Sequence, residues 1–151
     1  MNKKEAKLAR YQNIFSEIEG DKCFVAGRQR GKTTALAIDF DRNLDEDETS
    51  LILCNRHSMG INTRDYISKY IGHEIDTHVL SITASESVFR GRKPDRVYID
   101  NIDYIDNPEL QEFLKVIHND STVISTSTTH CSNIDKLSSK NHTILNTRDI
   151  I

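Results

Sequence analysis

The sequence lacks any apolar stretch long enough to span a membrane, and its first residues lack the hydrophobic segment of a secretory signal peptide. It also lacks internal repeats and low-complexity tracts. There are only three cysteines, Cys23, Cys54 and Cys131, and no second pair of ligands stands at a zinc-site spacing from them. We therefore expect a cytoplasmic protein with reduced, buried cysteines.

The charge of the chain excludes a protein that holds nucleic acid through overall positive charge. Its 151 residues carry a net charge of −3, and acidic residues concentrate in 39–48, where we expect a solvated surface. Arg90, Arg92 and Lys93 form a small basic cluster. If double-stranded DNA is bound, we expect this cluster to meet its phosphates, with weak and salt-sensitive affinity.

Residues 26–33, with the sequence AGRQRGKT, match the phosphate-binding loop pattern [AG]-x-x-x-x-G-K-[ST]. A short apolar run, 23–26, precedes the loop, and 34–38 follow it without glycine or proline. The loop is therefore expected to join a strand to a helix, so that backbone N–H groups and the helix N-terminus converge on an anion. Lys32 would neutralise the β- and γ-phosphates, and the Thr33 hydroxyl would bind Mg²⁺.

Short apolar runs alternate with amphipathic segments along the rest of the chain, which is typical of parallel strands joined by helices. We predict one domain with an α/β fold, a three-layer α/β/α sandwich of the P-loop NTPase kind with a mostly parallel sheet of about five or six strands. Its parts would be an N-terminal helical segment 1–20, a nucleotide-binding core 21–131 and a C-terminal extension 132–151. The predicted helices are 3–18, 32–42, 61–71 and 108–118; the predicted strands are 23–26, 51–54, 79–82, 96–100 and 122–126, with a short helix and a last strand near 143–145.

The helix predicted at 61–71 would follow a polar turn at 55–60. It is expected to bury its large apolar residues, which are Ile61, Tyr66, Ile67, Tyr70 and Ile71. The helix predicted at 108–118, with Pro108 near its start, carries one apolar face that consists of Leu110, Phe113, Leu114 and Ile117.

Asp100 ends a predicted apolar strand about 67 residues after Thr33. Ligands bind beyond the carboxyl ends of the strands in such a sheet, so Asp100 is placed to hold Mg²⁺ beside the phosphates. ATPases with this pair of motifs usually carry a glutamate directly after the aspartate, to polarise the attacking water. Here that residue is Asn101, whose amide cannot accept a proton. Asp103 is the nearest spare carboxylate, although a loop or helix-capping role fits its position better.

Taken together, these motifs resemble the ATPase domain of the large terminase subunit, the DNA-packaging motor of tailed phages. The resemblance covers about residues 8–131, and the R-Q-x-G-K-T-T form of the loop is characteristic of that family. The matching motifs are Tyr11-Gln12, residues 27–34, Ser58-Met59, Phe89-Arg90-Gly91, Val97-Tyr98-Ile99-Asp100 and residues 123–128.

The resemblance implies ATP and Mg²⁺ as ligands, with Thr33 and Asp100 at the metal and Gln12 at the adenine. It implies that Arg28 responds to the γ-phosphate and that, with Lys32 and the residue at position 101, it forms the catalytic set. Coupling of hydrolysis to movement would involve Ser125, Thr126, Ser127 and Thr128. The implied nucleotide-binding residues are Gln12, Ala26, Gly27, Arg28, Gln29, Arg30, Gly31, Lys32, Thr33 and Thr34.

Two departures from the family limit what the resemblance implies. Asn101 stands where the catalytic glutamate is expected, and the chain has no room for the further domains of a packaging subunit. One interpretation is a stand-alone, nucleotide-dependent regulatory or packaging-related phage factor in the host cytoplasm, with weak or no hydrolysis, whose partner would be another phage protein. Another is an active ATPase of helicase or translocase type that works on double-stranded DNA and recruits its base from Asp103 or from a partner. A scaffold that no longer binds nucleotide is disfavoured because Lys32, Thr33 and Asp100 are retained.

Overall fold

The structure is a computed structural model that describes residues 2–28, 31–44, 47–82, 93–117, 121–137 and 142–148. Helices and parallel strands alternate along most of the described chain, as the sequence predicts; residues 83–92, between the third and fourth strands, lie outside the described part. The elements in order are α1 (Lys3–Glu17), β1 (Lys22–Val25), α2 (Lys32–Arg42), β2 (Ser50–Cys54), α3 (His57–Ile71), β3 (His78–Ser81), β4 (Arg96–Ile99), the 3-10 turn η2 (Ile102–Tyr104), α4 (Asn107–Ile117), β5 (Thr122–Ser127), α5 (Ser132–Asp135) and β6 (Thr143–Asn146).

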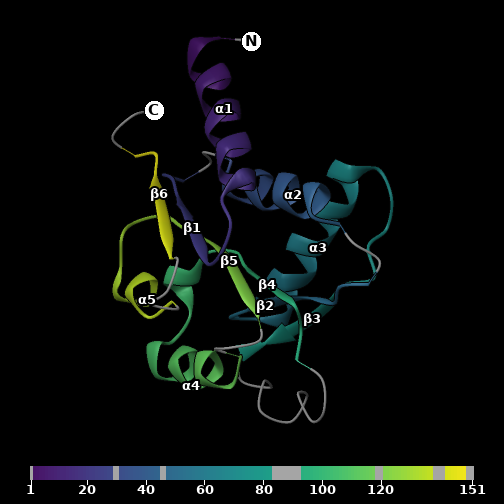
Figure 1. Ribbon diagram of the computed structural model, residues 1–151, viewed down its shortest axis with the longest axis vertical. Coiled ribbons are helices and arrows are strands. Elements are labelled where there is room, and N and C mark those ends of the chain that lie inside the picture. The colour runs from purple at the N-terminus through teal and green to yellow at the C-terminus, as the bar shows by residue number, and fades with distance from the viewer. Residues whose placement is uncertain are drawn as a thin grey trace.

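The six strands form one parallel sheet in the order β3-β2-β4-β5-β1-β6. Successive residues of a strand face opposite sides of the sheet, so Phe24 packs with α1 and α2, whereas Cys23 and Val25 pack with η2, α4 and α5. Helices cover both faces in Figure 1. The three-layer α/β/α sandwich is confirmed.

The buried residues predicted from the sequence are correct for helix α4 and partly wrong for helix α3. In α4 the predicted apolar face is buried, from Leu110 to Ile117. Helix α3 instead begins at His57, within the segment predicted as a turn, and the prediction that it buries Tyr66 and Tyr70 is wrong. These tyrosines are 42% and 49% exposed.

Close contact with the sheet explains which side of α3 is buried. The buried residues of α3 are Gly60, Thr63 and Ile67, which recur at helical spacing on one face. A Cβ atom on Gly60 would lie 2.5 Å from Val79 Cγ1 and 2.6 Å from Cys54 Sγ. Because the helix approaches the sheet this closely, small residues form its inner face and the bulky tyrosines point outward.

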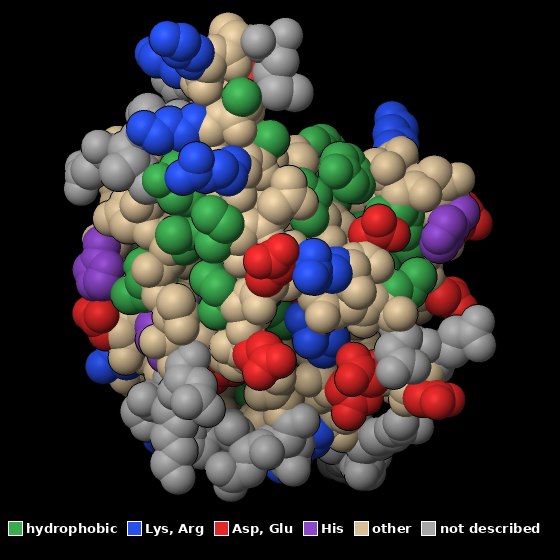
Figure 2. All heavy atoms as spheres, turned by 45° about the horizontal axis from the view of Figure 1, so that its top comes forward, with side chains coloured by type: hydrophobic (Ala, Val, Ile, Leu, Met, Phe, Trp, Pro, Cys, Tyr) green, Lys and Arg blue, Asp and Glu red, His purple; other side chains and the backbone are tan. Residues whose placement is uncertain are grey.

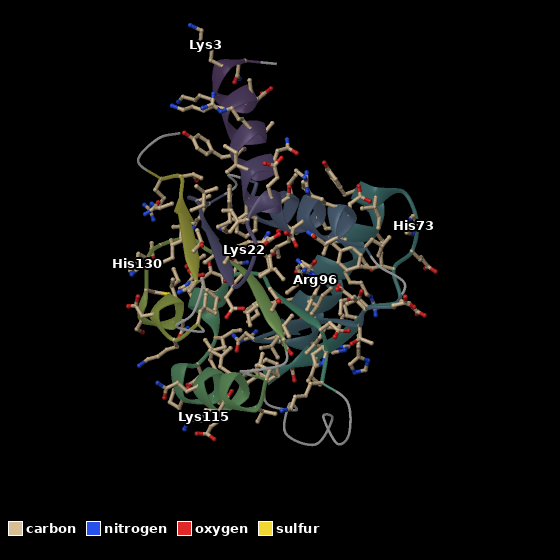
Figure 3. All side chains as sticks on the ribbon, in the orientation of Figure 1. Lys3, Lys22, His73, Arg96, Lys115 and His130 are labelled. Carbon is tan, nitrogen blue, oxygen red and sulfur yellow. The ribbon has the colours of Figure 1, made fainter. Side chains whose placement is uncertain are left out.

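A buried charged network ties α1, α2 and two strands together at the amino ends of β1 and β4. Asp39, in α2, is fully buried and accepts hydrogen bonds from Lys22 in β1, from Arg96 in β4 at 3.0 Å, and from the Tyr98 hydroxyl at 3.0 Å. Its burial departs from the expectation of a solvated acidic surface at 39–48. Figure 3 shows Lys22 and Arg96 near the middle of the molecule.

The Lys22 ammonium also ends helix α1. It donates to the carbonyl oxygens of Phe15 at 2.7 Å and Ile18 at 2.9 Å, where the last turn of α1 leaves carbonyls unpaired. Burial lowers the pKa of Lys22, and the Asp39 carboxylate opposes that effect. Burial also raises the pKa of Tyr98, so its hydroxyl stays protonated and donates to Asp39. The network therefore satisfies a buried cation, a buried anion and a helix end at once.

Helix α1 is supported by the rest of the molecule only over its second half. Its buried residues are Gln12, Phe15 and Ser16, whereas residues 2–7 are exposed. The first half of α1 projects from the body in Figures 1 and 2. None of the described helices is long and apolar enough to cross a membrane.

We expect Asp39→Ala to lower the free energy of unfolding by about 3–5 kcal/mol, because it leaves the Lys22 and Arg96 charges without their buried partner. Urea unfolding followed by circular dichroism measures this loss. Glu17→Ala is the control, since Glu17 and Arg42 form a 3.6 Å ion pair whose side chains are 60% and 53% exposed, and its loss should stay within about 0.5 kcal/mol. Equal losses in the two variants would contradict a stabilising role for the buried network.

Candidate nucleotide-binding site

The phosphate-loop motif lies between the carboxyl end of β1 and the first turn of α2, as predicted. Gly31 caps α2 with φ +75°, a left-handed conformation that favours glycine. The Gln12 side chain, from α1, donates from Nε2 to the Gly31 carbonyl oxygen at 2.9 Å. A Cβ atom at Gly31 would lie 2.3 Å from that nitrogen. The backbone conformation therefore favours glycine here, and a larger residue would also displace the Gln12 amide.

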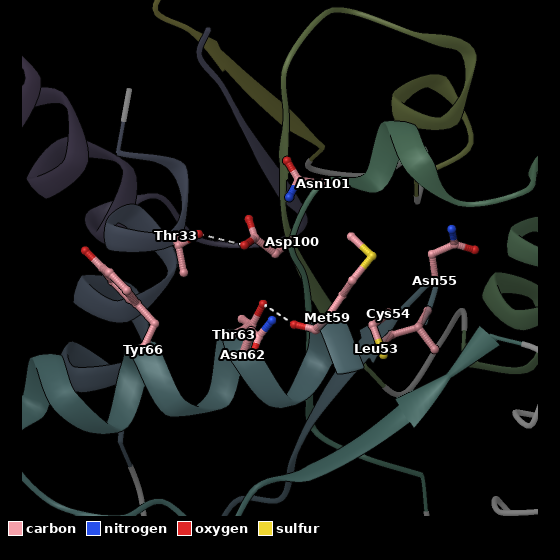
Figure 4. Close-up of a pocket in the computed structure, with 10 residues that line it drawn as sticks. All are labelled: Thr33, Leu53, Cys54, Asn55, Met59, Asn62, Thr63, Tyr66, Asp100 and Asn101. Atoms are coloured by element: carbon pink, nitrogen blue, oxygen red, sulfur yellow. Dashed lines mark hydrogen bonds between the residues drawn. The ribbon is translucent and has the colours of Figure 1, made fainter. Parts of the chain in front are cut away.

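The two predicted metal ligands lie side by side. The Thr33 hydroxyl donates to Asp100 Oδ2 at 2.7 Å, and Figure 4 shows this contact across the hollow between α2 and β4. The Thr126 hydroxyl, in β5, donates to Asp100 Oδ1 at 2.6 Å and accepts from the Asn101 N–H at 2.9 Å. A hydroxyl and a carboxylate are oxygen ligands of the kind that Mg²⁺ prefers, so the residues present fit this metal, with water and phosphate completing its shell.

Lys32 is also held by the end of β5. Its ammonium donates to Thr128 Oγ1 at 2.9 Å. The Thr128 carbonyl oxygen accepts from Arg148 at 2.8 Å, and its N–H points to Asp103 Oδ1 at the longer distance of 3.4 Å. Contacts from the phosphate loop, the C-terminal segment and η2 thus meet at Thr128.

The four hydroxyl residues after Ile124 separate into two pairs because they lie in or just beyond strand β5, where side chains alternate. Thr126 and Thr128 contact Asp100 and Lys32, at the candidate site. Ser125 donates to the Lys22 carbonyl oxygen at 3.2 Å, and Ser127 donates to the Thr129 carbonyl oxygen at 2.6 Å. The structure brings only the two threonines to the site.

Two hollows meet at the metal-ligand pair. One is a cavity of about 320 Å³ between β2, α3 and β4, with the amides of Asn55, Asn62 and Asn101 in its lining. The other is more open and is lined by Arg28, Lys32, Thr34, Tyr66 and Tyr104, among others. Thr33, Tyr66 and Asn101 line both. The more open hollow adjoins the loop, as a site for a triphosphate requires.

Asn101 has φ +57° and is the non-glycine residue with positive φ in the described part of the chain. Asparagine adopts this conformation more readily than most residues. Among the described residues that line the two hollows, Asp100 is the sole carboxylate, and it already accepts two hydrogen bonds. Neither hollow therefore presents a free general base beside the metal ligands.

The remaining predicted residues fall into three groups. Ala26 is buried and donates its N–H to the Ser127 carbonyl oxygen at 3.0 Å, and Gly27 follows it. Arg28 is exposed beside the open hollow, and the Thr34 hydroxyl is hydrogen-bonded to Tyr66. Gln29 and Arg30 lie outside the described residues, as do Arg90 and Arg92 of the basic cluster.

Sequence reasoning missed Tyr66, Tyr104 and Arg148 at this site. Arg148 is exposed and reaches Thr128 because β6 pairs with β1, where the Thr147 hydroxyl donates to the Val25 carbonyl oxygen at 2.8 Å. No local pattern marks a residue that comes to a site through the pairing of distant strands.

No family model and no curated protein matches the chain. Solved structures with the same fold include the Sulfolobus solfataricus SWI2/SNF2 ATPase core in complex with double-stranded DNA, with a TM-score of 0.60, 16% identity, and coverage of 85% of this chain and 31% of that one. The helicase MrfA matches with a TM-score of 0.58 and 13% identity over 97% of this chain and 30% of its own. The large terminase ATPase domain of a Thermus phage matches with a TM-score of 0.55 and 11% identity over 96% of this chain and 84% of its own.

These likenesses show the fold: the chain has the α/β architecture of P-loop ATPase domains. It spans about a third of the length of the SWI2/SNF2 and MrfA chains and most of the terminase ATPase domain.

We expect Lys32→Ala to abolish binding of ATP with Mg²⁺, because the loop's N–H groups alone offset the desolvation of a triphosphate poorly. Isothermal titration calorimetry measures this loss. Lys69→Ala, which removes an exposed lysine of α3, is the control and should leave the affinity unchanged. A wild-type protein that gives no heat with ATP, or a Lys32→Ala variant with wild-type affinity, would contradict the assignment.

Proposed function

We propose that this domain binds ATP with Mg²⁺ and hydrolyses it weakly or not at all, as a phage nucleotide-dependent regulatory or DNA-packaging-related factor. The observation that carries the proposal is that Thr33 and Thr126 both donate to Asp100, while Lys32, Thr33 and Asn101 line the adjoining open hollow. The family resemblance assigns the water-polarising role to position 101, where this chain has an amide.

In this proposal the loop binds the triphosphate, and the side chains of Lys32 and Thr33 give up their hydrogen bonds within the protein to contact the ligand. Lys32, which donates to the Thr128 hydroxyl, would bind the β- and γ-phosphates, and Thr33 and Asp100 would hold the metal. Bound Mg²⁺ supplies charge neutralisation at the phosphates. Arg28, exposed beside the open hollow, responds to the γ-phosphate. The Gln12 amide lies against the loop at Gly31, and in this proposal the same side chain contacts the adenine.

Thr126 and Thr128 transmit the presence of nucleotide to the rest of the domain. Thr128 is held by Lys32, by Arg148 and more weakly by Asp103, so the loss of the Lys32 contact changes the restraint on the segment that leads into α5. Coupling of this kind needs an element that can take two arrangements. Here that element is the segment after β5, and the hydrogen bond between Lys32 and the Thr128 hydroxyl is present in one arrangement and absent in the other.

Slow hydrolysis follows from the chemistry at position 101. An amide orients water but does not take its proton, and general-base assistance is worth roughly 10²–10⁴ in rate. Charge stabilisation by Lys32, Arg28 and the metal would remain. We therefore expect this protein to bind ATP but to hydrolyse it slowly.

A second candidate function is an active ATPase of helicase or translocase type on double-stranded DNA. Asp103 favours it, since this carboxylate lies next to the Thr128 N–H, close to the residue that contacts Lys32. One structural neighbour is a SWI2/SNF2 ATPase core bound to double-stranded DNA, at 16% identity. The first candidate is preferred because Asp103 does not line either hollow among the described residues.

We expect Asn101→Glu to raise ATP turnover tenfold or more while ATP affinity stays nearly unchanged, since the glutamate acts on the attacking water and not on the nucleotide. Steady-state phosphate release and calorimetry measure the two quantities. Asn101→Gly is the matched control, because glycine accepts φ +57° without adding a base, and its turnover should stay at the wild-type level.

Asp103→Ala separates the two functions in the same assay and should be neutral. If the wild type hydrolyses ATP at an ordinary rate, Asp103→Ala silences it and Asn101→Glu adds nothing, the regulatory proposal is wrong and the active ATPase replaces it.

A further inference from the structure

The exposed half of α1 carries a concentration of positive charge that the nucleotide site does not use. Lys3, Lys4, Lys7 and Arg10 are all exposed, and together they are called the basic face below. Lys3, Lys7 and Arg10 recur at helical spacing along about 10 Å of one side of the helix. Figure 2 shows Lys and Arg side chains gathered along this projecting helix, and Figure 3 places Lys3 at its far end.

The charges of the basic face are not neutralised within the described part of the molecule. The ion pairs there involve Lys22, Arg42, Arg96, Lys115 and His130. Arg10 lies over the ring of Tyr11, 5.8 Å from its centre, which supports the side chain without cancelling its charge. The rest of the chain is net acidic, since the whole carries −3. A separate cationic surface therefore stands on an acidic body.

The sequence of α1 places this charge against the helix dipole. Cations are unfavourable near a helix N-terminus, where the aligned N–H groups already form the positive end. Lys3 and Lys4 lie in the first turn, with only Glu5 and the Asn2 cap to compensate. Where local rules are broken in this way, function is the usual reason. A bound polyanion would be attracted by the lysines and by the helix end together.

We propose that the basic face, in place of the cluster of Arg90, Arg92 and Lys93 expected from the sequence, binds the phosphate backbone of double-stranded DNA. Phosphates of DNA are spaced closely enough for four cations along about 10 Å to contact several of them. The apolar side chains that α1 exposes are Ala6 and, one turn beyond Arg10, Ile14, which is 37% exposed. Two separate apolar residues form neither the continuous apolar face that inserts into a membrane nor the set of apolar anchors of a protein interface. Phosphates require charge alone, which is what this surface presents.

The helix that carries the basic face also contacts the phosphate loop, so DNA bound there would lie close to the candidate nucleotide site. Gln12, on the same helix, donates to the Gly31 carbonyl oxygen, and Leu8 Cδ2 would lie 3.2 Å from a Cβ atom at Gly31. DNA held on the first half of α1 therefore lies one rigid helix away from the phosphate loop. DNA binding itself does not depend on nucleotide, so this proposal is tested without ATP and stands or falls separately from the proposed function.

The test is fluorescence anisotropy with labelled double-stranded DNA, using the full chain across a salt series. Four phosphate contacts predict a log–log slope of about −3.6, or a loss of affinity on the order of 10² between 50 and 200 mM salt. The Lys3→Gln/Lys4→Gln/Lys7→Gln variant keeps Arg10, so its slope should fall to about −0.9. The control Lys69→Gln/Lys115→Gln/Lys136→Gln removes three exposed lysines elsewhere and should keep the wild-type slope.

Two more variants distinguish loss of the basic face from unfolding of α1 and from binding at the cluster of Arg90, Arg92 and Lys93. Lys3→Glu/Lys7→Glu should lose DNA binding while α1 stays folded, because acids at a helix N-terminus are favourable, and circular dichroism reports the fold. Arg90→Ala/Arg92→Ala/Lys93→Ala should bind like the wild type. The proposal is overturned if this last variant loses binding instead, if the lysine variants bind like the wild type, or if poly-glutamate displaces the DNA at equal charge.

Discussion

The architecture depends on the burial of one carboxylate, Asp39, at the amino ends of the strands. Its hydrogen bonds with Lys22, Arg96 and Tyr98 connect α2 to β1 and β4, and Lys22 in turn ends α1. A buried ion pair gains stability only when every partner is satisfied, because each unpaired charge would cost several kcal/mol. That requirement favours an arrangement in which these elements meet at Asp39. Together with the apolar packing of α2 on the sheet, it holds the helix whose first turn carries Lys32 and Thr33 to the opposite, carboxyl edge of the sheet.

At that edge, parallel strands bring together residues that are distant in sequence. Asp100 stands at the end of β4, and each of its carboxylate oxygens accepts a hydrogen bond from a threonine hydroxyl. The donors are Thr33, from α2, and Thr126, from β5. Lys32 is satisfied in the same way by Thr128. The candidate site is therefore hydrogen-bonded within the protein. In the proposed function, nucleotide would take over these hydrogen bonds rather than fill a set of unpaired groups, and this exchange would link the ligand to the segment after β5.

Asn101 combines a conformational and a chemical constraint at one position. Its positive φ suits asparagine better than glutamate, whose side chain is strained there at a cost of order 1–3 kcal/mol. The same residue lines both hollows, and in the proposed function it stands where a carboxylate would activate water. The comparison of Asn101→Glu with Asn101→Gly separates the two constraints, since glycine relieves the strain without adding a base.

The sequence by itself determined the phosphate loop, the pairing of Thr33 with Asp100, the alternation of strands and helices and the amphipathic face of α4. These follow from residue type and short-range periodicity, which are local properties of the chain. Only the tertiary structure decided that Asp39 is buried while its acidic neighbourhood suggested solvent, that Tyr66 and Tyr70 point outward, and that Arg148 reaches Thr128. The physical reason is that burial and proximity depend on which elements pack together. The close approach of α3 at Gly60 and the pairing of β6 with β1 are long-range events that no local pattern encodes.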